Sequence, residues 1–77
     1  MTERRYTIVL DPDPDEGGYA VYVPALPGCV TQGETEDECV VRAREAIEAY
    51  IESLEARGLP VPVETEPPRL LAVSVAA

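Results

Sequence analysis

Acidic side chains at alternate positions raise the question of metal binding in this sequence. Asp11, Asp13 and Asp15 imitate the first three ligands of a calcium-binding loop. That loop also needs glycine at its sixth position and a bidentate glutamate at its twelfth, where this chain has Glu16 and Tyr22. We therefore expect no metal and no cofactor. Residues Asp13, Asp15 and Glu16 are interpreted as a solvated acidic loop that helps to contact a basic partner.

Side chains suited to nucleophilic or acid–base catalysis are scarce. The chain has no histidine, and Ser53 and Ser74 have no base near them in sequence. Arg42 follows Cys39 by less than one helical turn, but the acids at 36–38 outweigh its charge. Carboxylates on an open surface lack the burial that shifts a pKa toward catalytic values. The sequence therefore predicts a protein that is not an enzyme. Cys29 and Cys39 are interpreted as reduced core residues, with a disulfide as the alternative.

The size and charge of the chain restrict its partners. Its 77 residues form a single domain, residues 1–77, with 15 acidic groups, 6 arginines and a net charge of −9. This charge repels phosphate backbones, so we expect no autonomous nucleic-acid binding, whereas it attracts a basic protein or simply keeps the chain soluble. No apolar run approaches the ~18 residues of a membrane span. We therefore expect no membrane association and a cytoplasmic location.

A long amphipathic helix is predicted for residues 35–57. Thr35 and Glu38 have the spacing of a capping box, and Gly58 followed by Pro60 is typical of a helix end. At ~100° per residue, one set of side chains forms an apolar stripe suited to packing on a sheet. This stripe consists of Cys39, Ala43, Ala46, Ile47, Tyr50 and Leu54.

The opposite face of this helix is acidic. Four glutamates, here named the acidic ridge, lie within an arc of ~80° almost opposite the apolar stripe: Glu45, Glu48, Glu52 and Glu55. Like charges this close together destabilise a helix slightly. We interpret the ridge as a docking face for a cationic surface, with an ordinary solvated helix face as the alternative.

Strand patterns flank the helix on both sides. Residues 5–10 and 19–23 alternate apolar and polar side chains, residues 11–18 form a proline- and glycine-rich hairpin loop, and residues 29–32 form a short third strand. The sequence thus predicts a three-stranded antiparallel sheet over 5–33, a proline-rich extended tether over 59–69 and a last strand over 70–75. That strand is apolar on both faces, so we expect a homo-oligomer, either a dimer or a tetramer.

Two stretches resemble the signature of the HicB-like antitoxin family. They read VPALPGCVTQGETEDE at residues 23–38 and AREAI at residues 43–47. The residues that carry the resemblance also have structural reasons: a turn, a strand end and a helix cap. These motif residues are Pro27, Gly28, Cys29, Gly33, Thr35 and Glu38.

The resemblance implies both a fold and a function. The family fold is a two-layer α+β domain of the order β-β-β-α-β, described as a reduced ribonuclease-H-like domain without its active site. HicB antitoxins sequester a small basic ribonuclease toxin and mask its RNA-binding surface. Many also carry a C-terminal DNA-binding domain, and we expect none after residue 75 here. The alternative is an orphan HicB-like domain with another protein-binding or small-ligand regulatory role.

Overall fold

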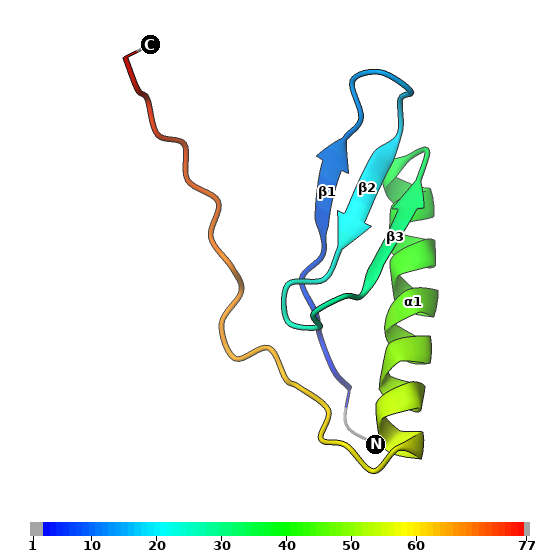
Figure 1. Ribbon diagram of the computed structural model, residues 1–77. Coiled ribbons are helices and arrows are strands. Elements are labelled where there is room, and N and C mark those ends of the chain that lie inside the picture. The colour runs from blue at the N-terminus through cyan, green and yellow to red at the C-terminus, as the bar shows by residue number, and fades with distance from the viewer. Residues whose placement is uncertain (1–2, 77) are drawn as a thin grey trace.

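Three short strands and one long helix form the folded part of the chain (Figure 1). The computed structural model describes residues 3–76. Strands β1 (Val9–Pro12), β2 (Tyr19–Tyr22) and β3 (Val30–Gly33) form an antiparallel sheet in the order β1-β2-β3, and α1 covers Glu36–Ala56. The helix packs on one face of the sheet, mainly behind β3. This arrangement confirms the predicted α+β class.

The first hairpin extends further into the proline-rich stretch than the sequence predicts. Strand pairing continues through Asp11 and Pro12, which the sequence places in the loop, so that boundary was wrong by two residues. The Asp13 N–H donates to the Gly18 carbonyl at 3.0 Å, so the backbone groups of the preceding residue, Pro12, face away from β2. Proline is tolerated there because β1 is an edge strand and no N–H is needed.

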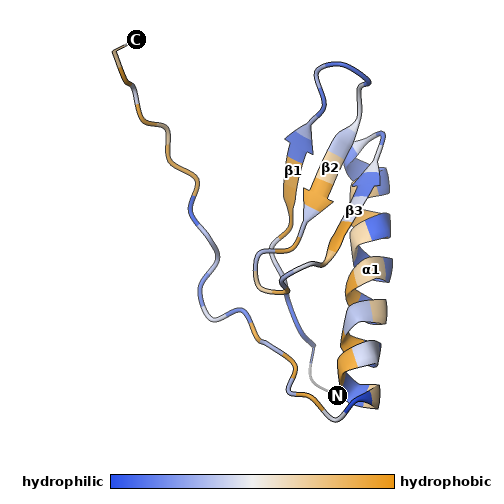
Figure 2. Cartoon of the chain, viewed as in Figure 1, coloured by the Kyte–Doolittle hydropathy of each residue, from blue (hydrophilic) through white to orange (hydrophobic). Residues whose placement is uncertain are grey.

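The apolar stripe of α1 lies against the sheet, as predicted. Cys39 and Ala43 are buried against Val21 of β2, and the lower half of the stripe closes over a second cluster of Val23, Leu26 and Cys29. Figure 2 shows α1 behind the sheet, with hydrophobic residues along the helix and on β2. The buried core is small. The close contact between Gly33 of β3 and Cys39 of α1 is therefore an important part of the packing.

A tight turn connects β2 to β3 and also supports the helix. The Cys29 N–H donates to the Leu26 carbonyl at 3.0 Å, with Pro27 and Gly28 at the two central positions. Gly28 has φ of 83°, so this is the type II turn that proline followed by glycine favours. The Tyr50 hydroxyl donates to the Pro27 carbonyl at 2.8 Å and so joins the turn to α1.

The helix ends where the sequence predicts. Gly58 adopts φ of 67°. Its N–H donates to the Glu55 carbonyl at 3.1 Å, and the Leu59 N–H donates to the Leu54 carbonyl at 2.9 Å. This is a Schellman motif, in which a left-handed glycine lets the chain reverse direction.

The tether then returns along the N-terminal segment before it leaves the domain. The Tyr6 hydroxyl donates to the Pro62 carbonyl at 2.6 Å, and Glu64 contacts Thr7. Residues 65–76, here named the tail, project away from the sheet (Figure 1). The expected last strand, residues 70–75, is extended backbone that pairs with no other strand of the described chain. The radius of gyration is consequently 14.6 Å, against ~11.5 Å for a compact chain of this length.

Candidate partner-binding surfaces

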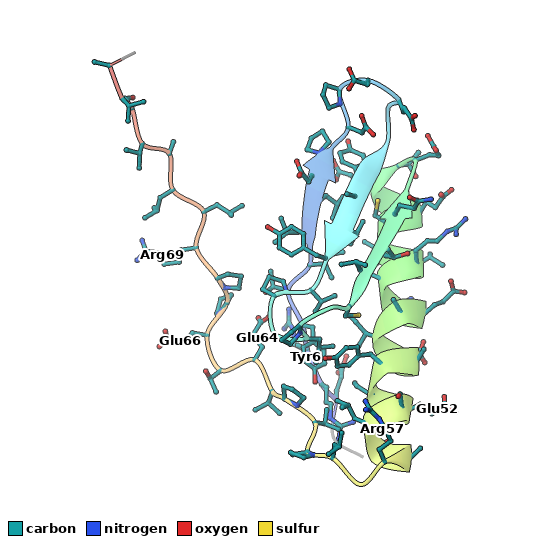
Figure 3. The ribbon with its side chains drawn as sticks, in the orientation of Figure 1. Tyr6, Glu52, Arg57, Glu64, Glu66 and Arg69 are labelled. Carbon is teal, nitrogen blue, oxygen red and sulfur yellow. The ribbon has the colours of Figure 1, made fainter. Side chains whose placement is uncertain are left out.

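The acidic ridge is exposed along the outer side of α1. All four of its glutamates lie on the exposed side of the helix, and Figure 3 shows Glu52 pointing away from the sheet. Val41 lies on the same face with 53% of its surface exposed. The helix positions these side chains because its apolar stripe is fixed against β2 and β3, which leaves the opposite arc to solvent.

Most of the ridge charge is uncompensated by the chain itself. Glu55 Oε2 lies 3.9 Å from Arg4 Nη2, on the segment that leads into β1. Within residues 3–76, the other three ridge glutamates take part in no ion pair. The ridge therefore presents at least three free carboxylates to a partner.

The hairpin loop uses one of its acids to hold its own shape. Asp13 Oδ1 accepts hydrogen bonds from the backbone N–H groups of Glu16 (3.1 Å) and Asp15 (2.9 Å). These two bonds lower the pKa of Asp13 because they favour its charged form. Asp13 is therefore an internal turn-forming residue, whereas the side chains of Asp15 and Glu16 are exposed.

The structure places this loop beside the start of α1. Asp13 and Glu16 line a concavity of about 510 Å³ together with Glu34, Glu38 and Arg42. Glu45, the first glutamate of the ridge, lies seven residues beyond Glu38, or ~10.5 Å further along the helix axis and on nearly the same face of α1. The loop and the start of α1 thus form a second acidic surface that adjoins the N-terminal end of the ridge. The sequence did not predict that Glu34 and Glu38 join the hairpin loop in one acidic concavity, because that depends on how the hairpin packs against the helix.

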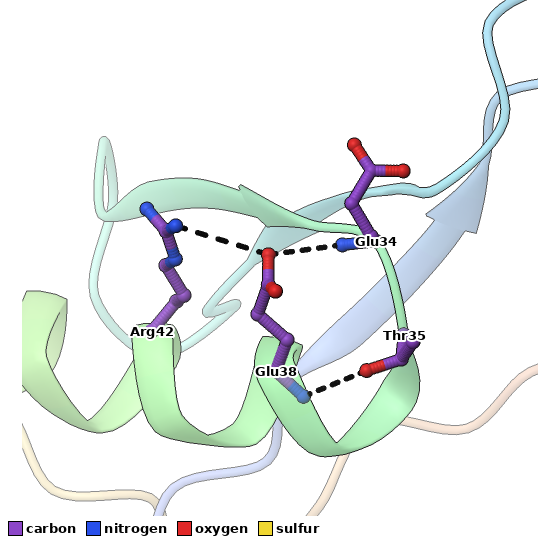
Figure 4. Close-up of polar contacts among 4 residues, drawn as sticks. All are labelled: Glu34, Thr35, Glu38 and Arg42. Carbon is purple, nitrogen blue, oxygen red and sulfur yellow. Dashed lines mark hydrogen bonds and ion pairs between the residues drawn. The ribbon is translucent and has the colours of Figure 1, made fainter.

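The capping contacts at this end of α1 are shown in Figure 4. The Glu38 N–H donates to Thr35 Oγ1 at 3.1 Å, as a capping box requires. The Glu38 carboxylate accepts from the backbone N–H of Glu34 (3.2 Å) and lies 3.8 Å from Arg42 Nη2. The predicted cap is therefore present, with the return bond made one residue before the N-cap.

The remaining motif residues are structural. Pro27, Gly28 and Cys29 build the turn after β2, and Cys29 is buried. Gly33 lies against Cys39, where a Cβ would come within 2.8 Å of the sulfur. None of these residues offers a side chain to a partner on the acidic surfaces.

Both thiols are free and buried. Burial raises the pKa of Cys29, and burial together with the carboxylates of Glu38, Glu36 and Glu34 raises the pKa of Cys39. A thiol with a raised pKa is a poor nucleophile at neutral pH.

Neither a metal centre nor a membrane span emerges from residues 3–76. No three Asp, Glu, Cys or His side chains in this part of the chain come together as metal ligands. No helix within it combines the length and the apolar character needed to cross a bilayer.

A groove of about 560 Å³ runs between α1 and the segment that leads into β1. Its apolar residues are Ile8, Val40, Ala43, Ile47 and Ile51, and charged residues at its rim include Arg4, Arg44 and Glu48. The groove exists because α1 packs on β3 and β2 and leaves the β1 side of the sheet less covered.

Comparison with known proteins gives consistent matches. Residues 6–72 match the family model described as HicB-like antitoxin of bacterial toxin-antitoxin system. A UPF0150 protein of Thermoplasma acidophilum is 50% identical over 58 residues, which cover 75% of this chain and 83% of that protein. Antitoxin HicB 1 of Photorhabdus laumondii is 41% identical over 63 residues, covering 77% of this chain and 40% of that protein. Antitoxin HicB of Escherichia coli K12 is 38% identical over 65 residues, covering 79% of this chain and 46% of that protein. The chain thus spans less than half of each named antitoxin.

Proposed function

Because the chain belongs to the HicB-like antitoxin family, we propose that it sequesters a small basic ribonuclease toxin and masks the RNA-binding surface of that toxin. The family implies a toxin partner and a regulatory role. In this proposal the toxin is basic and cleaves RNA. The chain blocks it by covering its surface and catalyses no reaction of its own. The same proposal places the protein in the cytoplasm, where such a toxin meets RNA.

The acidic ridge is the observation that carries this proposal. Three of its four glutamates are free of ion pairs within residues 3–76, and the whole chain has a net charge of −9. A cationic surface that binds RNA phosphates also fits a row of carboxylates, since both present regularly spaced negative charge. Val41, exposed on the same face one helical turn before Glu45, adds an apolar contact at the N-terminal end of the ridge.

Association kinetics with any small basic protein found to be encoded beside this chain test the proposal. We expect the wild-type on-rate to fall steeply with salt, because the Debye length shrinks from ~30 Å at 0.01 M to ~8 Å at 0.15 M ionic strength. Glu52→Lys should slow association by roughly threefold or more at low salt, with little change in folding because the side chain is exposed.

Glu66→Lys is the matched control. It makes the same change in net charge, but Glu66 projects from the tail, far from Glu52 (Figure 3). Equal on-rates for the two variants would remove the ridge from the mechanism and leave only a general effect of net charge. Asp15→Lys, on the hairpin loop, tests in the same way whether the second acidic surface contributes.

An orphan HicB-like domain with another partner is the second candidate. It is favoured by a relative of which this chain covers 83%, a UPF0150 protein whose name gives no partner. Failure of the wild-type chain to bind any neighbouring basic protein would support this alternative.

A further inference from the structure

The outer edge of β3 has backbone groups that no other strand of the domain uses. The Val23 N–H donates to the Cys29 carbonyl at 3.1 Å, so these two residues form a bonded pair, and bonded and non-bonded pairs alternate along an antiparallel ladder. The N–H and C=O groups of Val30 and Gln32 therefore point away from β2. Within residues 3–76, no strand pairs with this side of β3 (Figure 1). Two N–H and two C=O groups are thus available to an added strand.

This edge lacks side chains that usually protect a sheet from an added strand. Edge strands of natural proteins commonly carry charged residues or prolines, which prevent pairing with another chain. The other edge strand, β1, has both, in Asp11 and Pro12. The sequence of β3 is VTQG, with no charge and no proline. The edge of β3 is therefore the less protected of the two.

The helix leaves room beside β3 for the side chains of an added strand. In helical projection, one flank of the apolar stripe consists of Arg42, Ala46, Ala49 and Ser53. Arg42 lines a concavity with Gln32 of β3, whereas Val40 and Arg44, on the opposite flank, line the groove beside the segment that leads into β1. The first flank therefore lies on the β3 side. Beyond Arg42 its residues are small, so it can accommodate side chains of a strand placed ~4.8 Å beyond β3.

Carboxylates near this edge determine the charge of the segment that fits it. The concavity at the C-terminal end of β3 has Glu16, Glu34 and Glu38 in its lining. On α1, Glu45 and Glu52 are the ridge glutamates nearest to the β3 flank in helical projection. Of these five residues, only Glu38 takes part in an ion pair within residues 3–76. An extended segment with positively charged side chains therefore complements this edge.

We propose that an extended, basic segment of the partner pairs with the outer edge of β3 and becomes a fourth strand of the sheet. Its backbone satisfies the outward groups of Val30 and Gln32, and its cationic side chains reach the carboxylates of the concavity and of the ridge. Main-chain hydrogen bonds are a general source of affinity when a strand is added to a sheet edge. The inference rests on the proposed function, since the partner is the basic toxin, and it adds a backbone contact to the attraction of the ridge.

Proline at the two outward positions tests the edge. Val30→Pro/Gln32→Pro removes both outward N–H groups, whereas the bonds from β3 to β2 come from the alternate residues and remain. With the small basic protein of the association experiment, we expect the dissociation rate to rise by roughly tenfold or more. The on-rate at low salt should change little, because the ridge charge is intact. Both side chains are exposed, so the domain should stay folded, and a thermal melt checks this.

Val30→Thr/Gln32→Thr is the matched control. It changes the same two side chains but keeps both N–H groups, so it should dissociate like the wild type. Equal dissociation rates for the wild type and Val30→Pro/Gln32→Pro would overturn the proposal, and so would equally fast dissociation of the threonine and proline variants.

Amide exchange locates the contact. The Val30 and Gln32 amides should exchange freely in the chain alone and become protected in the complex, while the Thr31 amide, bonded to β2, stays protected in both. A complex in which the two outward amides remain unprotected would overturn the strand pairing and leave the ridge in place. Failure of the wild type to bind at all would overturn the proposed function as well. Protection of both amides without the partner would mean that another segment already occupies the edge, which also overturns the proposal.

Discussion

Replacing Gly33 with alanine tests whether the close approach of β3 to α1 limits stability. A Cβ at Gly33 would lie 2.8 Å from the Cys39 sulfur, 3.0 Å from the Cys39 nitrogen and 3.2 Å from its Cα. Carbon atoms in favourable contact are ~3.5–4.0 Å apart, so the overlap is roughly 0.5–1 Å. Two of the three contacts are with backbone atoms, which move only if the start of the helix moves.

The expected cost is that of overpacking a core, about 1–3 kcal/mol. A domain of this length has a total free energy of unfolding of ~4–12 kcal/mol, so the loss is a substantial fraction. Each kcal/mol lowers the Tm of such a small domain by ~4–8 °C. Urea unfolding and thermal melting of Gly33→Ala at one protein concentration measure both quantities, and concentration is fixed because association changes the apparent Tm.

A double-mutant cycle separates the clash from other effects of alanine. Cys39→Ala removes the sulfur that is nearest to the new Cβ, so it should cost less in the Gly33→Ala background than in the wild type, with a coupling of at least ~0.5 kcal/mol. Gly28→Ala is the control, because a Cβ there meets no atom within 4 Å and its cost comes from φ of 83° alone. Its effect should add to that of Cys39→Ala. A Gly33→Ala protein as stable as the wild type would refute the packing argument.

Two further predictions concern the start of the helix and the tether. Thr35→Ala should lower the free energy of unfolding by ~1 kcal/mol in urea titrations, because it removes the acceptor for the Glu38 N–H, whereas Thr35→Ser should retain most of it. Hydrogen bonds from the Thr7 side chain and backbone hold the pKa of Glu64 below its ordinary value of 4.5. The contact between Glu64 and Thr7 therefore stabilises the fold fully at pH values above 4.5, and this stabilisation is lost as the pH falls through the lowered pKa of Glu64. The Thr7 amide shift followed by NMR should titrate in acid in the wild type and stay flat in Glu64→Gln.

Features encoded by neighbouring residues were predicted from the sequence. The helix start at Thr35 and its end at Gly58 depend on side chains and backbone conformations within a few positions of each terminus. The exposed ridge follows from helical periodicity alone. In each case the deciding interaction is local, so the order of residues contains it.

Features that depend on the path of the chain were not predicted. Pro12 belongs to β1 because its missing N–H falls on the outer edge, and the sequence does not state which strand is at the edge. The contact between Glu64 and Thr7 joins residues 57 apart. The second acidic surface needs the hairpin loop and the start of α1 to meet, which only the packing of the helix on β3 determines.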